Sequence, residues 1–565
     1  MGLTQSGSAA KQGIGGGLRR FWHSIRQPKT AYMVLFGFSS GLPYALLLGT
    51  LYAWLSDAKV DLETMGVFSL IGLTYAFKFL WSPLIDRLSL PVLSRLGHRK
   101  QWIVLAQMSL GAIMILLSML DPASAIGLFS LLAGIGAFAS ATQDVVIDAW
   151  RVDVADEEAT VDILSTVYQL GYRAAVLVGG ALALFLADGF GWPLVYALMG
   201  AILVALGVAS LFAPENRRAE AMVESVDQLR QPGELQPKIR ALALGVVGLL
   251  WLWALADVVR FMILSLGSDP VDRPDSVEFV SVQGPIIVIA TVVIPSIIAA
   301  VLAWMQRNGR STLEAAAPRG HWSDAVLDHG YRALILPLTD IMGRLGWAAV
   351  LVLTLVLSYR ITDTIWGTFA YPFYLGELAY TKSEVAVASK FFGVGALMLG
   401  VTLGGVLFAM IGRMATMTIG ALTAALTNLL YADLSQGGAV MAAVSRFTGF
   451  TWLVEHLGGD ERLARLMVAI GGENIAGGIA GAALVAYLSS ITSKGYSAVQ
   501  YALLSSLTFL VGTLGRGALG KMIETDGYYP VFLFTTALGF IAVVLCLLEW
   551  ARTARAARAQ AAAAD

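Results

Sequence analysis

Charged residues are scarce in this chain. Only 14% of its 565 residues are charged, whereas soluble domains carry about 25%. The 38 Lys and Arg and the 39 Asp and Glu nearly cancel, leaving a net charge of −1. No basic block is long enough to indicate a nucleic-acid partner. The composition therefore excludes an ordinary soluble domain and a nucleic-acid-binding protein.

Cysteine, clustered histidine and short catalytic motifs are also missing. The single cysteine, Cys546, excludes a disulfide within the chain. The five histidines, at positions 23, 98, 321, 329 and 456, show no metal-ligand spacing. The sequence has neither a Walker A lysine loop nor a Gly-x-Ser-x-Gly nucleophile motif. We therefore expect no resident metal or cofactor, no direct use of ATP, and no enzymatic activity.

Apolar residues, by contrast, make up 57% of the chain, and the mean hydropathy is +0.71. A membrane-spanning helix needs about 20 mainly apolar residues. Fourteen stretches meet this requirement, and we expect helices near 31–55, 64–86, 101–120, 124–149, 162–187, 191–213, 241–266, 279–304, 347–375, 384–411, 414–434, 464–492, 498–520 and 530–550. The sequence thus predicts an all-α integral membrane protein with fourteen transmembrane helices.

The spacing of these stretches predicts how the chain is divided. Six spans, two extra spans and six further spans are separated by polar linkers, and two six-helix bundles are the usual plan of a secondary transporter. The predicted parts are a tail (1–30), an N-terminal bundle (31–213), a linker (214–240), two extra helices (241–304), a second linker (305–345), a C-terminal bundle (346–550) and a second tail (551–565).

Basic residues predict the orientation of the chain in the membrane. With the amino terminus in the cytoplasm, the cytoplasmic tails, loops and linkers hold 25 of the 38 Lys and Arg, opposite loops hold 7, and the spans hold the remaining 6. Cytoplasmic loops characteristically carry such an excess. We therefore expect both termini and both linkers on the cytoplasmic side.

Several charged residues fall inside the predicted spans, where each costs about 2.5 kcal/mol or more. Asp144 and Asp148 are four residues apart, so they share one helix face. Two carboxylates this close do not both ionise cheaply, which makes the pair a candidate for proton coupling. The alternative is a cytoplasmic gate, in which Asp148 and Asp153 pair with Arg151 or Arg173.

Two lysines and one polar pair point to a solute with carboxylate and hydroxyl groups. Lys78 and Lys390 occur in opposite halves of the chain and are predicted to bind carboxylates from one shared cavity. The alternative for each is snorkelling toward the nearer membrane interface. Glu473 and Asn474 lie among glycines that leave room for a bulky ligand, and an acid beside an amide suits hydroxyl and acetamido groups.

The turn after the second predicted span resembles the signature loop of the major facilitator superfamily. It carries Asp86 and Arg87, followed by a basic cluster that contains Arg99. In that superfamily the loop latches helices together on the cytoplasmic side, so the resemblance implies a latch formed by these residues. The alternative is that they are ordinary positively charged anchors.

A series of motifs extends the resemblance over most of residues 31–550. The motifs are Gly37-Phe-Ser-Ser-Gly41-Leu-Pro43, Ala53-Trp-Leu-Ser-Asp57-Ala, Lys78-Phe-Leu-Trp81-Ser-Pro-Leu-Ile-Asp86-Arg87, Ala141-Thr-Gln-Asp144-Val-Val-Ile-Asp148-Ala-Trp-Arg151-Val-Asp153, Gly171-Tyr-Arg173, Glu473-Asn474-Ile-Ala-Gly-Gly and Ala498-Val-Gln500-Tyr-Ala-Leu-Leu-Ser-Ser. In this order they resemble the AmpG-type muropeptide permeases, a branch of the major facilitator superfamily. The stretch 435–463 looks inserted relative to that pattern.

This resemblance implies a monomeric, proton-driven importer in the bacterial inner membrane, with lipid as its surroundings. The family's substrates are N-acetylglucosaminyl-1,6-anhydro-N-acetylmuramic acid and its peptide-bearing forms, which are recycled into peptidoglycan and in some bacteria induce β-lactamase. The predicted substrate site also includes Gln143, Tyr172, Arg173, Asp363 and Gln500. The alternatives are a related carrier of another polar anion, such as acetyl-CoA, and a membrane scaffold that transports nothing.

Overall fold

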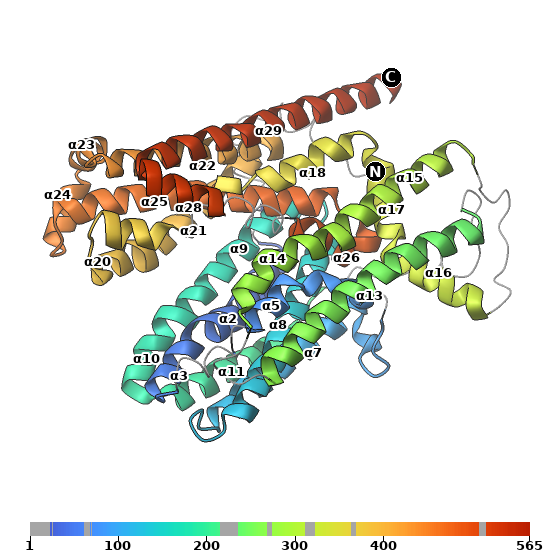
Figure 1. Cartoon of the computed structure of the whole chain (residues 1–565), viewed down its shortest axis with the longest axis horizontal. Helices are drawn as coiled ribbons and strands as arrows, with labels where there is room; N and C mark the ends of the chain where they lie inside the picture. The colour runs from blue at the N-terminus through green and yellow to red at the C-terminus, as the bar shows by residue number, and fades with distance from the viewer. Residues whose placement is uncertain are drawn as a thin grey trace.

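The computed structural model describes residues 23–24, 26–60, 68, 70–86, 88–214, 235–267, 274–310, 322–362, 369–507 and 516–564. This part of the chain is built from α-helices, interrupted by short 3₁₀ and π-helical segments (Figure 1). The long apolar runs and the low charge of the sequence account for this helical architecture, because a helix satisfies its own backbone hydrogen bonds without water.

The helices of the N-terminal half include two continuous runs with a π-helical turn inside them, α2–η3–α3 and α9–η7–α10. They are α2 (Pro28–Ala45), η3 (Leu46–Thr50), α3 (Leu51–Asp57), α5 (Leu70–Ala76), η5 (Lys78–Leu80), α6 (Ser82–Ile85), η6 (Ser94–Leu96), α7 (His98–Ser118), α8 (Ile126–Val154), α9 (Val161–Leu177), η7 (Val178–Leu182), α10 (Ala183–Phe190) and α11 (Trp192–Ser210).

A middle group joins the two halves. It comprises α13 (Pro237–Gly267), α14 (Ser276–Val288), η9 (Ile289–Val293), α15 (Ile294–Arg307), α16 (Trp322–Leu334) and α17 (Leu336–Leu345). Of these, α16 and α17 lie within residues 305–345, which the sequence predicts to be a linker.

The helices of the C-terminal half are α18 (Ala348–Ser358), η10 (Pro372–Glu377), α20 (Lys382–Ala386), η11 (Val387–Phe392), α21 (Gly393–Ile411), α22 (Arg413–Ser435), α23 (Ala439–Phe447), α24 (Phe450–His456), α25 (Glu461–Ile491), η12 (Lys494–Tyr496), α26 (Ser497–Ser506), α28 (Arg516–Asp526) and α29 (Tyr528–Ala564). The inserted stretch noted in the sequence forms α23 and α24.

The all-helical membrane fold is confirmed, whereas the count of fourteen spans stays a prediction. Among the described residues, 11 helices are long and apolar enough to cross a membrane, or up to 12 if α17 and α18, which meet at 106°, form one bent span. Each of these 11 helices coincides with a predicted span. The predicted spans at 64–86, 347–375 and 498–520 fall on shorter helical segments, and parts of them lie outside the described residues.

The two halves form a V (Figure 1). They meet where α9 packs against α21 and α25 and where α26 packs against α8, and they diverge toward the ends that carry α10 on one side and α24 on the other. Glycines allow close packing within each half: a Cβ at Gly37 would overlap the backbone carbonyl of Tyr168. The arrangement leaves the inner faces of the halves close together at one end only.

The middle group packs against both halves. Its helix α13 packs against η9, with the Trp251 indole N–H donating to the carbonyl of Thr291 at 3.2 Å. Phe79 of η5 makes an edge contact with Trp251 at 6.4 Å between ring centroids. On the far side α17 contacts α26 of the C-terminal half. The extra helices therefore contact the second predicted span, and α17 connects the middle group to α26 of the C-terminal half.

Candidate functional site

The centre of the candidate site is an ion pair between the second span and α8. A 3₁₀ turn, η5, interrupts the second span and carries Lys78, whose Nζ lies 3.5 Å from Oδ2 of Asp144. The side chains are 22% and 10% exposed, respectively. The other carboxylate oxygen of Asp144 has no hydrogen-bond partner among the described residues. The pair is thus buried but only singly bonded, which leaves the carboxylate free to change its protonation state without breaking a larger network.

Aromatic side chains surround this pair. The Tyr75 hydroxyl donates to Ser140 Oγ at 2.8 Å, one helical turn from Asp144. The ring of Tyr44 lies 5.3 Å from that of Tyr75 and 6.0 Å from that of Tyr172. Such faces stack on sugar rings, although each also suits packing alone.

Arg173 continues the cluster from α9. Its guanidinium stacks 5.6 Å from the ring centroid of Tyr172, and its buried Nε has no hydrogen-bond partner among the described residues. A cation held by an aromatic ring and short of hydrogen-bond acceptors is suited to receive an anionic ligand.

Gln143 lies inside the N-terminal half rather than beside Lys78. It is fully buried, and its amide donates to Ser39 Oγ at 3.3 Å. Ser39 also accepts from Gln107, whose own carbonyl oxygen accepts from Ser210 at 2.5 Å. This arrangement connects α2, α7, α8 and α11, so Gln143 positions α8 within its bundle.

Asp148, one turn beyond Asp144, has a different partner. Its Oδ1 lies 2.9 Å from the guanidinium of Arg151 on the same helix. Arg151 is fully buried, donates to Ser489 Oγ at 3.1 Å, and lies between the rings of Tyr168 and Tyr501 at 5.1 and 5.0 Å. Since Ser489 and Tyr501 belong to the C-terminal half, Asp148 acts in holding the halves together.

The residues of the signature loop make a second contact between the halves. Arg99 lies 2.6 Å from Asp86 and 2.9 Å from Asp153, and it donates to Ser497 Oγ at 2.9 Å. The backbone N–H of Val499 donates to Asp86 Oδ2 at 3.0 Å. Two carboxylates and one arginine of the N-terminal half therefore hold the first turn of α26, where backbone N–H groups favour negative charge.

A third contact involves Arg413, whose guanidinium donates to both oxygens of Asp162 at 2.6 and 3.1 Å. Lys494 adds a bond to the backbone carbonyl of Ala155 at 2.8 Å. Arg87, also predicted for the latch, lies outside the described residues. All three contacts lie at the end where the halves meet.

The loop between α8 and α9 is fixed at the same end. Asp156 accepts from the backbone N–H of Ala159 at 2.8 Å and from Lys29 at the start of α2. Partial burial acts to raise its pKa, but Lys29 and the backbone N–H donors prevail and hold the pKa of Asp156 below its ordinary value.

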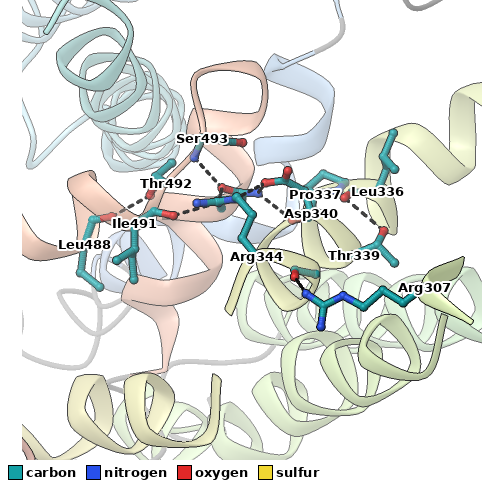
Figure 2. A network of polar contacts seen from close by, with 12 residues as sticks. Arg307, Leu336, Pro337, Thr339, Asp340, Arg344, Leu488, Ile491, Thr492 and Ser493 are labelled. Atoms are coloured by element: carbon teal, nitrogen blue, oxygen red, sulfur yellow. Dashed lines mark hydrogen bonds and ion pairs between the residues drawn. The ribbon is translucent and has the colours of Figure 1, made fainter. Parts of the chain in front are cut away.

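Gln500 takes part in a separate network between α17 and the beginning of α26. Its amide donates to the carbonyl of Pro337 at 2.7 Å and to Asp340 at 2.8 Å, and its oxygen accepts from the backbone N–H of Ser493. Arg344 donates to the carbonyl of Ile491 at 2.9 Å, and Figure 2 shows this arginine reaching across from α17. Gln500 is therefore 1% exposed, inside a structural junction.

In the C-terminal half, Glu473 ends a chain of hydroxyl groups. Tyr431 donates to its carboxylate, and Tyr374 donates to the Tyr431 oxygen at 2.9 Å. Asn474 donates to the carbonyl of Ile470 at 2.8 Å. Asp363, the remaining predicted residue of this half, lies outside the described residues.

Lys390 is exposed on η11, with its Nζ 5.9 Å from the ring centroid of Tyr371.

Of the predicted site residues, the structure brings Lys78, Asp144, Tyr172 and Arg173 into one cluster. It places Gln143 and Gln500 in structural networks. Glu473, Asn474 and Lys390 lie on α25 and η11, which pack against each other.

Sequence reasoning gave no role to several residues that join the halves. Asp162, Arg413, Ser489 and Ser497 are the clearest of them, with partners hundreds of positions away. Asp162 and Arg413 lie at the ends of predicted spans, and Arg413 also belongs to the degenerate second copy of the signature loop, but neither pattern gives its partner. The two serines offer no signal.

Comparison with known proteins places these features in context. The anhydromuropeptide permease of Escherichia coli (strain K12) is 29% identical over 537 residues, which cover 94% of this chain and 82% of that protein. The putative transporter AmpG 4 of Rickettsia conorii is 26% identical over 91% of this chain and 94% of that protein. Over most of its length this chain is similar to the AmpG-type permeases.

Two further comparisons agree with this relationship. The family model described as Acetyl-coenzyme A transporter 1 matches residues 30–126. Among solved structures, the major facilitator superfamily transporter FucP in its outward conformation covers 93% of this chain and 99% of its own, with 11% identity and a TM-score of 0.52. The chain therefore has the major facilitator fold and is a multi-pass membrane protein related to permeases.

Proposed function

We propose that this protein is a proton-coupled importer of muropeptides, N-acetylglucosaminyl-1,6-anhydro-N-acetylmuramic acid with or without its peptide, for peptidoglycan recycling. The observation that carries the proposal is the similarity to an anhydromuropeptide permease over 94% of the chain. The polar cluster around Lys78 and Asp144 supports it, because buried charge in a span usually marks a transport path. On this account the protein is a carrier and no enzyme.

Coupling follows from the single bond between Lys78 and Asp144. When Asp144 takes up a proton from the outer side, its attraction for Lys78 falls, and the ammonium becomes available to a carboxylate of the substrate. Arg173 and the tyrosines supply a second cation and faces for the sugar rings. Proton and substrate thereby enter together, and deprotonation on the inner side restores the ion pair and expels the ligand.

The V shape corresponds to one end state of alternating access (Figure 1). The contacts of Arg99, Arg151 and Arg413 close the end where the halves meet, and the opposite end diverges. With both termini in the cytoplasm, as the basic residues predict, the closed end is cytoplasmic and this state faces outward. Rocking of the halves about the cluster then opens the inner side.

The proposal places the protein in the bacterial inner membrane as a monomer, with the domain limits predicted from the sequence and with the imported muropeptides available to induce β-lactamase. Asp144 carries the proton, and Asp148 serves the closed gate. Lys78 and Arg173 bind the substrate from the N-terminal half, and Glu473 and Asn474 bind it from the C-terminal half.

The test is uptake of radiolabelled disaccharide anhydromuropeptide into proteoliposomes, with and without an inward proton gradient. We expect accumulation that needs the gradient and collapses when a protonophore is added. Uptake at the same rate with and without the gradient would refute proton coupling. A folded protein that takes up no muropeptide would refute the proposed substrate.

A second candidate is transport of acetyl-CoA, favoured by the family model that matches residues 30–126. Competition separates the two: excess unlabelled acetyl-CoA should leave muropeptide uptake unchanged. Strong inhibition, together with uptake of labelled acetyl-CoA itself, would favour the second candidate. A protein that transports neither would be a membrane scaffold.

A further inference from the structure

A pocket opens beside two π-helical segments of the C-terminal half. Its volume is about 100 Å³, and Tyr371, Lys382, Ser389 and Lys390 line it together with the apolar side chains of Leu375, Val385 and Ala386. η10 forms one wall, and α20 with η11 forms the other. π-helical turns inside longer helices are frequent at functional sites, because they re-aim side chains at the cost of regular hydrogen bonding.

Two ammonium groups share this small pocket. Neither Lys382 nor Lys390 has an ion-pair partner among the residues that the structure describes. Lys390 lies over the ring of Tyr371 at 5.9 Å, which keeps its charge on the pocket wall. Two cations that line one pocket, each without an ion-pair partner among the described residues, suit a ligand that brings its own negative charge.

The pocket is connected to the polar residues of α25 on both sides. From η10, Tyr374 donates to Tyr431, which donates to Glu473. From the other wall, the residue that follows η11, Gly393, is packed so closely that an added Cβ would lie 3.3 Å from Nδ2 of Asn474. The elements that form the two walls of the pocket therefore also contact Glu473 and Asn474, the predicted sugar-binding pair.

We propose that this pocket is a vestibule that binds the carboxylates of the peptide carried by a muropeptide, before the sugars reach the central cluster. This proposal rests on the proposed function, because it assigns the peptide of the muropeptide to this pocket and the sugars to the central cluster. Lys382 and Lys390 attract the peptide carboxylates, and Tyr371 packs against the peptide. The sugar rings then lie toward Glu473 and Asn474, and the vestibule sets the preference for peptide-bearing forms.

The experiment measures KM and maximal rate of uptake in proteoliposomes for two probes: the disaccharide alone and the disaccharide with its tripeptide. The variants are Lys382→Ala, Lys390→Ala and the double variant, with Lys59→Asn as the control. Lys59 is an exposed lysine at the outer end of the other half, and asparagine tolerates its positive φ of 57°. All vesicles are prepared in neutral and in anionic lipid.

We expect the double variant to raise KM for the tripeptide form by about tenfold, the effect of losing charge-assisted contacts. KM for the disaccharide alone should change less than about twofold, and the control should match the unmodified protein. Equal KM values for the tripeptide form in the double variant and the unmodified protein would overturn the proposal. A change confined to anionic vesicles would also overturn it, since the lysines would then bind lipid phosphate. Absence of any uptake by the unmodified protein would instead refute the proposed function.

Discussion

Three carboxylates in the C-terminal part of α8 have three different partners. Asp144 pairs with Lys78, Asp148 with Arg151, and Asp153 with Arg99. An arginine is always charged and binds through a rigid fork, whereas a lysine is a mobile point charge. Asp144, whose ion-pair partner is the lysine, is therefore the residue of the three whose partner can move away most easily, and this difference supports the proposal that it carries the proton.

Charge balance at this pair gives a prediction for stability. Lys78→Met leaves a buried carboxylate without its cation and should lower the free energy of unfolding by up to about 3 kcal/mol. Adding Asp144→Asn removes the unpaired charge, so the double variant should regain much of that loss. Thermal unfolding in detergent, followed by tryptophan fluorescence, measures both. A double variant less stable than Lys78→Met would contradict the pairing.

At the scale of helices, glycines allow close packing of α21 against α25 in the C-terminal half. On α25, a Cβ at Gly478 would overlap the carbonyl of Leu397 on α21, and the neighbouring Gly477 has open space around it. The small residues let the two backbones approach, as in many membrane helix pairs.

These neighbours form a matched pair of variants. Gly478→Ala must push α21 away from α25 and should cost about 1–3 kcal/mol, as overpacking does. Gly477→Ala adds a methyl group in open space and should be neutral or slightly stabilising, since alanine favours helix. Melting temperatures of the two purified variants test this. Equal melting temperatures would show that the helices are not packed at Gly478.

How much of this could be read from the sequence depends on the scale of the interaction. Hydropathy predicted 11 helices that the structure contains, because length and apolarity are local properties. It did not predict the 3₁₀ turn that carries Lys78 or the π-helical turns around Lys390, which change the backbone without changing the hydropathy.

For the site, the i, i+4 spacing correctly places Asp144 and Asp148 on one helix, and the Asp148–Arg151 pair given as the alternative is present in the structure. Gln143 and Gln500 belong to motifs of the expected family, and yet their amides bond inside structural networks. Contacts between halves, such as Arg99 to Ser497, join positions 398 residues apart, and no local pattern reports them.

At the scale of the whole molecule, the equilibrium between outward and inward states depends on the contacts that close one end. Asp162 and Arg413 are partly exposed, at 17% and 30%, so they can separate at modest cost. Arg99 and Arg151 are almost fully buried and hold the closed end more firmly.

Charge reversal at one member of the Asp162–Arg413 pair should shift the equilibrium between the outward and inward states. Arg413→Asp places two carboxylates together and should favour opening of the closed end, and adding Asp162→Arg should restore the outward state. Spin labels at Asp188→Cys on α10 and His456→Cys on α24, with Cys546 replaced by serine, report the distance between the diverging ends. We expect a shorter distance in Arg413→Asp and recovery in the double exchange. An unchanged distance distribution would mean that this pair does not contribute to the gate.

The most direct test of the central claim, that Asp144 couples protons to muropeptide movement, compares two modes of transport in one variant. Proteoliposomes with Asp144→Asn are assayed for gradient-driven accumulation of labelled disaccharide anhydromuropeptide and for exchange against unlabelled substrate without a gradient. The account predicts that accumulation is lost and exchange persists, because the neutral side chain mimics the protonated state and leaves the carrier able to change conformation with substrate bound. Accumulation at the level of the unmodified protein would contradict it and move the proton to another group.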